Sequence, residues 1–99
     1  MSRYARRTDS NHRAIVKALE TAGASVLTIT TSKPGAPDLA FGVAQRTFLA
    51  EIKAGKASPR DNQLEFARKW RGGVVHVLRS PLEALQLVQM IRMTRGERL

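Results

Sequence analysis

The 99-residue chain contains no cysteine, and only eight of its residues are Asp or Glu. Without thiols it can form neither disulfides nor thiolate metal sites, and their absence leans towards a reducing cellular interior. Nowhere does an uninterrupted apolar run approach the roughly 18 residues that span a membrane. The Arg-rich start is not followed by the apolar segment of a secretory signal. We therefore expect a protein without membrane contact that stays in the cytoplasm.

What the chain has in excess is positive charge. Seventeen Lys and Arg against eight Asp and Glu give a formal net charge of +9 at pH 7. Such a field attracts polyanions, of which nucleic acid is the commonest, and the binding should weaken steeply with added salt. Solubility or assembly into an RNA particle would also explain a basic chain. Charge therefore favours a nucleic-acid partner and says nothing about chemistry.

Hydrophobic periodicity and turn residues predict seven elements in the order α-β-β-β-α-β-α. We expect helices over about 10–22, 60–70 and 80–93, and strands over 25–30, 38–43, 46–53 and 74–79. Residues 1–8 lack apolar periodicity and are interpreted as a flexible basic arm, residues 9–93 as the domain and residues 94–99 as a frayed tail. The order predicts an α/β (α+β) fold, a single domain with a mixed central sheet flanked by helices.

Two of the few carboxylates lie in apolar surroundings. Asp38 opens an apolar strand, and Glu51 is embedded in another, where an unpaired charge is costly. If the hairpin turns at Ala44-Gln45, Asp38 lies directly opposite Glu51, with Cβ atoms roughly 4.5–5.5 Å apart. Lys53 follows Glu51 by two residues and points to the same face. Like charges so placed repel each other, so we expect a cation to bind between the two carboxylates at this edge of the sheet.

A hard divalent cation suits these residues. Carboxylates, water and phosphate oxygens are the ligands that Mg²⁺ prefers, and the bound ion can polarise a phosphodiester and activate a water. Asp38, Glu51 and Lys53 therefore predict phosphodiester hydrolysis. The alternative is that Asp38 merely begins a strand and that Glu51 and Lys53 form a surface pair, because Glu-x-Lys is common in strands. The register favours the metal site.

The order and spacing of several motifs resemble the PD-(D/E)xK nuclease superfamily, and within it the short phage-type members of the virus-type replication-repair nuclease (VRR-NUC) family. The resemblance runs from Asp9 to about Leu85. Its main motifs are Pro37-Asp38, Glu51-Ile52-Lys53, Gln63 and the Trp70-Arg71-Gly72 turn. It implies a restriction-endonuclease-like domain that cleaves DNA, preferably branched DNA, in replication, repair or recombination in a bacterial or phage-infected cell.

The resemblance also implies roles for individual residues. Asp38, Glu51 and the Ile52 backbone carbonyl would bind Mg²⁺ or Mn²⁺, Lys53 would be the catalytic lysine, and Gln63 would contact the site from its helix. Many members complete the metal shell with a Glu on the first helix. Here Asn11 occupies the stripe that can point at the site, and its neutral amide is a weaker ligand than a carboxylate.

Other residues bear on DNA contact and assembly. The basic residues that we expect to contact DNA are Arg3, Arg6, Arg7, Arg13, Lys56 and Arg60. A flexible solvated tail would explain the first three equally well. The last helix is apolar nearly all round, with a core face expected at Ala84, Leu85, Val88 and Ile91, and this pattern predicts a homodimer. Two further readings stay open, a catalytically weak or inactive DNA-binding module and an accessory subunit of a larger replication protein.

Overall fold

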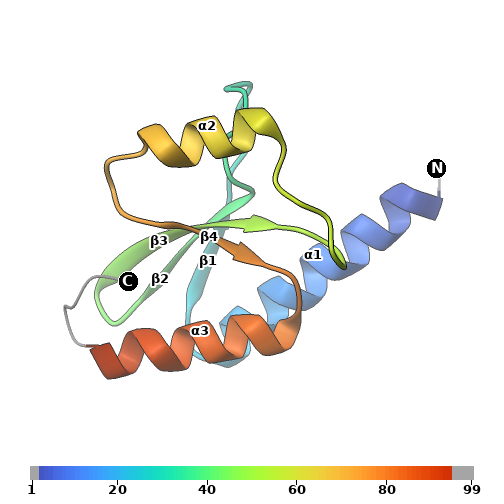
Figure 1. Ribbon diagram of the computed structural model, residues 1–99. Coiled ribbons are helices and arrows are strands. Elements are labelled where there is room, and N and C mark those ends of the chain that lie inside the picture. The colour runs from blue at the N-terminus through green and yellow to red at the C-terminus, as the bar shows by residue number, and fades with distance from the viewer. Residues whose placement is uncertain (1–2, 95–99) are drawn as a thin grey trace.

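The structure is a computed structural model that describes residues 3–94. Seven elements follow one another in the predicted order: α1 (Arg3–Thr21), β1 (Ser25–Thr28), β2 (Leu39–Val43), β3 (Arg46–Ile52), α2 (Asp61–Lys69), β4 (Val75–Leu78) and α3 (Pro81–Thr94). Figure 1 shows three layers, with α1 and α3 on one face of the sheet and α2 on the other. None of the helices in this part of the chain is long and apolar enough to cross a membrane.

The four strands form one mixed sheet in the order β1-β2-β3-β4. The first two pairs of neighbours are antiparallel, and β3 pairs with β4 in parallel. The parallel pair needs a crossover connection, which α2 provides. The predicted α+β domain, with a mixed sheet between helices, is confirmed.

β2 and β3 form the predicted hairpin. Its turn residues, Ala44 and Gln45, have φ angles of 55° and 64°, the left-handed conformation of tight hairpin turns. Leu39 pairs with Ala50, which is the register expected from the sequence. The alternation of side chains along this register sends one set of residues into the core and leaves the acidic residues on the opposite face.

The core fills the space between the sheet and the α1–α3 layer. Its most deeply buried members, each at most 1% exposed, are Ile15, Leu19, Leu39, Phe41, Ala50, Ala84, Val88 and Ile91. Burying a large apolar side chain contributes about 1.5–3 kcal/mol. The core therefore fixes the hairpin from one side and makes the opposite face available for a site.

The first helix starts earlier than the sequence predicted. It begins at Arg3, whereas residues 1–8 were expected to form a flexible arm and the helix to start near residue 10. The intervening segment contains neither Gly nor Pro, and Ala and Arg are strong helix formers. The helix can therefore continue without an apolar stripe. The side chains of residues 3–9, and residues 1–2 altogether, lie outside the described part of the chain.

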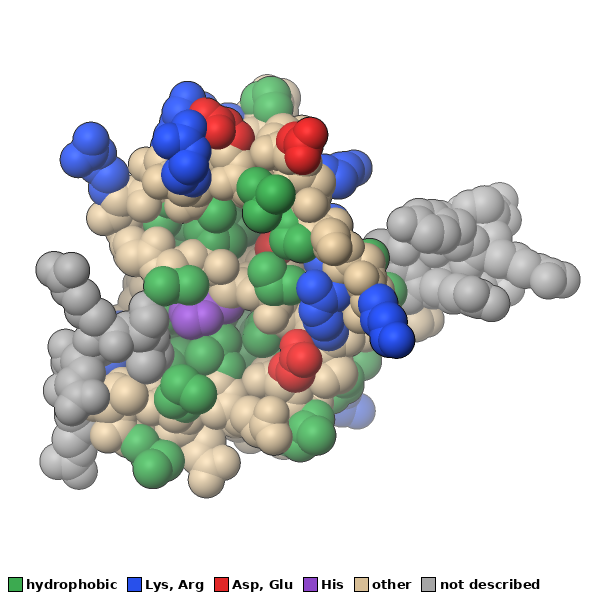
Figure 2. All heavy atoms as spheres, viewed as in Figure 1, with side chains coloured by type: hydrophobic (Ala, Val, Ile, Leu, Met, Phe, Trp, Pro, Cys, Tyr) green, Lys and Arg blue, Asp and Glu red, His purple; other side chains and the backbone are tan. Residues whose placement is uncertain are grey.

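The last helix also differs in detail. Leu87 is in the core, whereas Leu85, expected there, is 41% exposed. The buried residues Ala84, Leu87, Val88 and Ile91 form one stripe at helical spacing, and Leu85 lies next to it on the wheel. Thr94, assigned to the tail from the sequence, ends α3, and residues 95–99 lie outside the described residues. Figure 2 shows hydrophobic side chains on the outer surface of this helix.

Candidate metal and DNA-cleavage site

Asp38 directly precedes β2 and is fixed through both its backbone and its side chain. Its N–H donates to the Ala50 carbonyl at 3.1 Å, and its carbonyl accepts from the Ile29 N–H at 2.9 Å. Its carboxylate oxygen Oδ2 accepts from the Ile52 N–H at 2.7 Å. The Asp38 carboxylate is therefore held across the hairpin, at the end of β3.

The loop that leads to Asp38 packs on the start of α2. Gly35 has a φ of 77°, and a Cβ at this position would overlap the Asn62 carbonyl oxygen. Only glycine combines this backbone conformation with such a close approach. Pro37 is buried next to Asp38. The Gly-Ala-Pro-Asp segment thus ties the hairpin to the second helix.

Glu51 is a buried acidic residue, only 5% exposed. Desolvation by burial, followed by a hydrogen bond to Asp38 and by its negative charge, raises the pKa of Glu51 from 4.5 to about 8. The positive charges of Lys53 and Arg60 partly offset this rise in pKa. A second negative charge beside Asp38 is unfavourable, so in the absence of a cation Glu51 holds a proton near pH 7. The predicted meeting of Asp38 and Glu51 is thus present in the structure.

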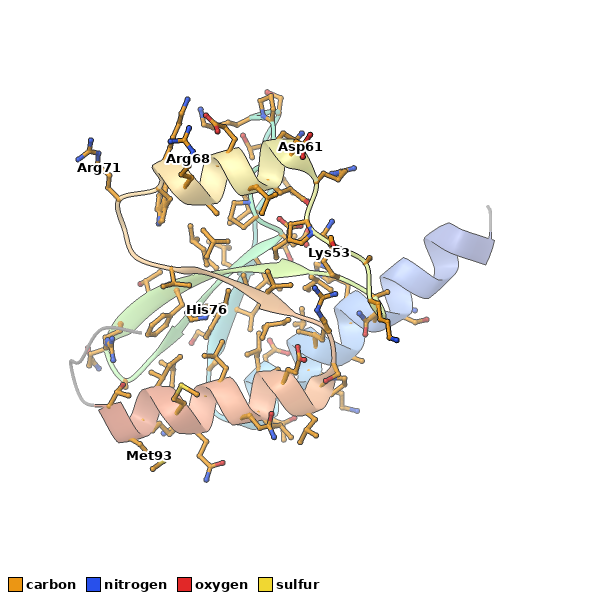
Figure 3. All side chains as sticks on the ribbon, viewed as in Figure 1. Lys53, Asp61, Arg68, Arg71, His76 and Met93 are labelled. Atoms are coloured by element: carbon orange, nitrogen blue, oxygen red, sulfur yellow. The ribbon has the colours of Figure 1, made fainter. Side chains whose placement is uncertain are left out.

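Lys53 lies just beyond β3, between the sheet and the loop to α2 (Figure 3). Its N–H donates to the Leu78 carbonyl at 3.1 Å, which extends the β3–β4 pairing by one bond. Its own carbonyl accepts from the Asn11 side-chain nitrogen at 3.4 Å. Asn11 therefore reaches the site from α1, and this contact positions the backbone of Lys53.

Gln63 is 7% exposed and lies in the first turn of α2. Its side-chain oxygen accepts from the Arg60 backbone N–H at 2.8 Å, a bond that closes the start of the helix. The charge of Arg60 in turn lowers the pKa of Glu51. Gln63 thus fixes the backbone of Arg60, and its predicted contact with the site itself stays a prediction.

Of the other predicted DNA contacts, Lys56 and Arg60 lie in the segment between β3 and α2, and Arg13 lies on α1. Arg13, Lys56 and Arg60 are exposed, as phosphate-binding residues must be. Arg3, Arg6 and Arg7 belong to α1, and their side chains lie outside the described part of the chain.

Arg79 was missed from the sequence. Its guanidinium donates to the Gly55 carbonyl at 3.2 Å and to the Ala57 carbonyl at 2.5 Å, which brackets Lys56. Its N–H donates to Glu83 at 2.7 Å. The one available signal was the place of Arg79 at the end of β4, the parallel neighbour of β3. Arg79 braces the loop that follows Lys53.

The available donors suit a small, hard cation. Among the described side chains, those of residues 10–94, no three His, Cys, Asp or Glu gather into a cluster, so the site offers the Asp38 and Glu51 carboxylates and the nearby Ile52 carbonyl. Mg²⁺ typically takes one or two carboxylates and keeps several waters. The residues present therefore fit Mg²⁺ or Mn²⁺.

Comparison with known proteins supports the same assignment. No family model matches the chain, and no curated protein sequence matches it. A solved structure described as a VRR_NUC domain superimposes with a TM-score of 0.67 at 25% sequence identity, over 83% of this chain and 94% of the other. The likeness covers most of both chains. The likeness in fold supports the assignment of the chain to the VRR-NUC family.

Proposed function

We propose that this protein is a metal-dependent DNA nuclease that hydrolyses phosphodiester bonds at Asp38, Glu51 and Lys53. The observation that carries the proposal is the hydrogen-bonded pair of carboxyl groups formed by the buried Glu51 and the half-buried Asp38. Such a pair is costly without a cation, and proteins keep costly charge pairs mainly where they serve a function. The VRR_NUC neighbour supports nuclease chemistry, and the net charge of +9 supports DNA as the substrate.

Each residue has a part that follows from its position. Asp38 and Glu51, with the Ile52 carbonyl, would hold Mg²⁺ or Mn²⁺. When bound, the ion supplies Lewis-acid polarisation of the scissile phosphate and a water of lowered pKa. The Ile52 N–H orients the Asp38 carboxylate through its 2.7 Å bond, as supporting groups do for metal ligands.

The basic side chains would act on the DNA itself. The Lys53 ammonium would orient the attacking water and stabilise negative charge that develops on the phosphate. Arg13, Lys56 and Arg60 would bind the flanking phosphates, which positions the strand without reading its sequence. A preference for branched DNA in replication, repair or recombination rests on the family resemblance.

Homodimerisation is part of the proposal. α3 leaves Leu82 61%, Met90 52% and Met93 75% exposed, on one outer surface of the helix. A second copy placed on this surface would bury these side chains and add a second active site to the DNA footprint. A monomeric mass at micromolar concentration, measured by sedimentation or light scattering, would contradict this arrangement.

The test is cleavage of labelled linear, flapped and four-way-junction DNA with Mg²⁺, with Mn²⁺ and with EDTA. We expect cutting with either metal, none with EDTA, and none by Glu51→Ala. Glu20→Ala is the matched control, because Glu20 is an exposed carboxylate whose removal changes the net charge equally. Binding without cutting under every metal would instead favour a DNA-binding module.

One observation favours that second candidate function, a DNA-binding module of low or no activity. The first helix offers Asn11 to the site, and its side-chain nitrogen is bonded to the Lys53 carbonyl. A neutral amide binds a cation more weakly than a carboxylate. If Asn11 limits catalysis, Asn11→Asp should raise both the affinity for Mn²⁺ and the cleavage rate. If Asn11→Asp does not cut either, the loss of a carboxylate at this position does not explain inactivity.

A further inference from the structure

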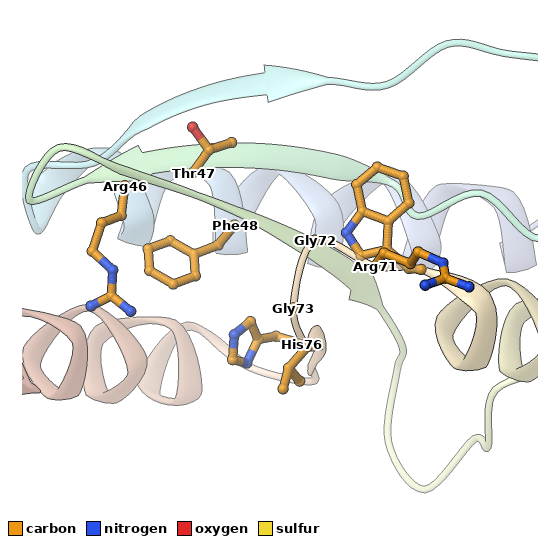
Figure 4. Close-up of a pocket in the computed structure, with 9 residues that line it drawn as sticks. Arg46, Thr47, Phe48, Arg71, Gly72, Gly73 and His76 are labelled. Carbon is orange, nitrogen blue, oxygen red and sulfur yellow. The ribbon is translucent and has the colours of Figure 1, made fainter. Parts of the chain in front are cut away.

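A pocket of about 640 Å³ opens at the end of β3 that lies away from Asp38 and Glu51. Two arginines and three aromatic rings contribute to its lining, namely Arg46, Arg71, Phe48, Trp70 and His76. In Figure 4, Arg46, Phe48 and His76 lie on one side of the pocket, and Arg71 and Gly72 lie on the other. The pocket therefore combines positive charge with flat apolar surface.

The wall on the side of β3 is held in place by its own contacts. The Arg46 guanidinium lies over the Phe48 ring, 5.1 Å from its centroid, and donates to the Thr94 hydroxyl at 3.3 Å. His76 packs edge-on against Phe48, with ring centroids 5.9 Å apart. A wall that is already ordered loses little conformational freedom when a ligand binds.

The opposite wall is built from the end of α2 and the loop after it. Trp70 stacks on Phe66, with centroids 5.5 Å apart and an angle of 15° between the planes. A Cβ at Gly72 would overlap the Trp70 indole, whereas a Cβ at Gly73 would meet no atom within 4 Å. The two glycines keep this wall thin and leave the space in front of it open, with the exposed Arg71 at its edge.

We propose that this pocket binds an unpaired nucleotide of the DNA strand on which the nuclease acts, an inference that rests on the proposed function. Guanidinium groups bind phosphate oxygens through charge-assisted hydrogen bonds. Aromatic side chains offer apolar surface to a base without regard to its identity. A nucleotide inside an intact duplex enters such a pocket only after it is unstacked and unpaired, which is costly. The pocket thus selects DNA that already has unpaired nucleotides.

The position of the pocket relates it to the cleavage site. Thr47 lines the pocket from the face of the sheet that also carries Glu51, four residues further along β3, whereas Arg46 and Phe48 line it from the opposite face, so the pocket opens around the end of the strand. Four residues of β-strand extend about 13 Å, and one strand of duplex DNA advances about 3.4 Å per nucleotide. The pocket therefore lies within about four nucleotides of the scissile phosphate. The enzyme should cut at a fixed distance from the boundary between paired and unpaired DNA.

The chain carries its own probe for this pocket, because Trp70 is its single tryptophan. The full chain in EDTA is titrated with a short single-stranded oligothymidylate and, separately, with a blunt duplex, while the Trp70 emission is followed. We expect a saturable change with the single strand and little change with the duplex. The proposal is overturned if the single strand does not bind. It is also overturned if fluorescence anisotropy of a labelled single strand shows binding while the Trp70 emission stays unchanged.

Three variants separate the pocket from general charge attraction. Arg71→Ala should weaken single-strand binding about tenfold, as loss of a charge-assisted contact does. Arg68→Ala is the matched control, because Arg68 is exposed, lies three residues before Arg71 in the last turn of α2, and pairs with Glu65 at 2.7 Å. Thr47→Phe fills the pocket from an exposed strand position that tolerates an aromatic residue. Equal losses for both arginine variants, or unchanged binding by Thr47→Phe, would overturn the proposal.

Cleavage assays keep the two proposals apart. If the wild type cuts flapped and blunt DNA equally well and Thr47→Phe cuts like the wild type, the nuclease function is supported and the nucleotide pocket is contradicted. If the binding results are as expected but no metal supports cutting, the nucleotide pocket is supported and the nuclease function is contradicted.

Discussion

The Ile52 backbone N–H donates a 2.7 Å hydrogen bond to the carboxylate of Asp38, so the residue between Glu51 and Lys53 orients the acid on the neighbouring strand. This hydrogen bond thereby links the Pro37-Asp38 motif to the Glu51-Ile52-Lys53 motif at one end of the hairpin. The bond also separates two roles of Asp38, which are to satisfy a backbone donor and to carry negative charge. Substitutions can test these two roles independently.

Asp38→Asn keeps an oxygen that can accept from Ile52, but it removes the charge beside Glu51. We expect unchanged or slightly higher thermal stability in EDTA, because a repulsion is lost. The affinity for Mn²⁺ should fall by more than the roughly 10- to 100-fold that loss of a supporting group costs. Asp38→Ala also leaves the Ile52 donor unpaired, which should cost about 1–3 kcal/mol of stability. Thermal unfolding and calorimetric titration measure both effects, and undiminished Mn²⁺ binding by the Asn variant would exclude Asp38 as a ligand.

The stability of the metal-free protein should fall as the pH rises. Burial and the neighbouring Asp38 raise the pKa of Glu51 from 4.5 to about 8, so the folded state holds a proton that the unfolded state has released. The contribution of this proton is complete below pH 4.5 and is lost as the pH rises to about 8. The slope in that window should reach at most about 1.4 kcal/mol per pH unit.

Chemical denaturation in EDTA across this pH range measures the slope. Glu51→Gln, which cannot titrate, should flatten it. Mn²⁺ competes with the same proton, so its affinity for the wild type should rise with pH and level off near pH 8. A slope that persists in Glu51→Gln would assign the pH dependence to another group.

Gly35→Ala should weaken the metal site indirectly, by displacing the loop that positions Asp38. The Ala side chain would overlap the Asn62 carbonyl, at a backbone φ of 77°, and the loop would have to move with Asp38. We expect a loss of about 1–3 kcal/mol in the free energy of unfolding together with weaker Mn²⁺ binding. Gly55→Ala is the control, because Gly55 has a positive φ of 55° but no atom within 4 Å of its Cβ position. Equal losses in the two variants would show that backbone strain alone, and not the contact with α2, explains the effect.

The hairpin and its pair of acids could be predicted because their pattern admits one register. Apolar residues alternate along β2, and shifting the pairing by one residue would turn Leu39, Phe41 and Val43 away from the core. A turn at Ala44-Gln45 then fixes which residues face each other. The meeting of Asp38 and Glu51 follows from local patterns alone.

Features that depend on contacts distant in sequence could not be predicted. Leu85 and Leu87 are equally apolar, and only the packing of α3 against the sheet and α1 decides which of them is buried. Arg79 binds carbonyls that lie 22 and 24 residues before it, and no local sequence pattern indicates such a contact. The early start of α1 was missed because helix propensity, without apolar periodicity, is a weak signal.

Arg79 should position Lys56 for DNA. Because Arg79 binds the Gly55 and Ala57 carbonyls on either side of Lys56, removing it should release the loop and misplace the ammonium. We expect Arg79→Ala to raise KM for DNA about as much as Lys56→Ala does, with a smaller effect on kcat. If Arg79 acts through Lys56, the double variant should be no worse than either single one, since coupled residues are not additive.

Arg79→Lys tests the geometry, since a lysine keeps the charge but loses the planar fork that reaches both carbonyls. It should recover only part of the lost affinity. Arg92→Ala is the matched control, because the exposed Arg92 also donates to a backbone carbonyl, that of Ala22, at 2.8 Å. Additive losses in the Arg79 and Lys56 double variant would mean that Arg79 contacts the DNA or stabilises the domain independently of the loop.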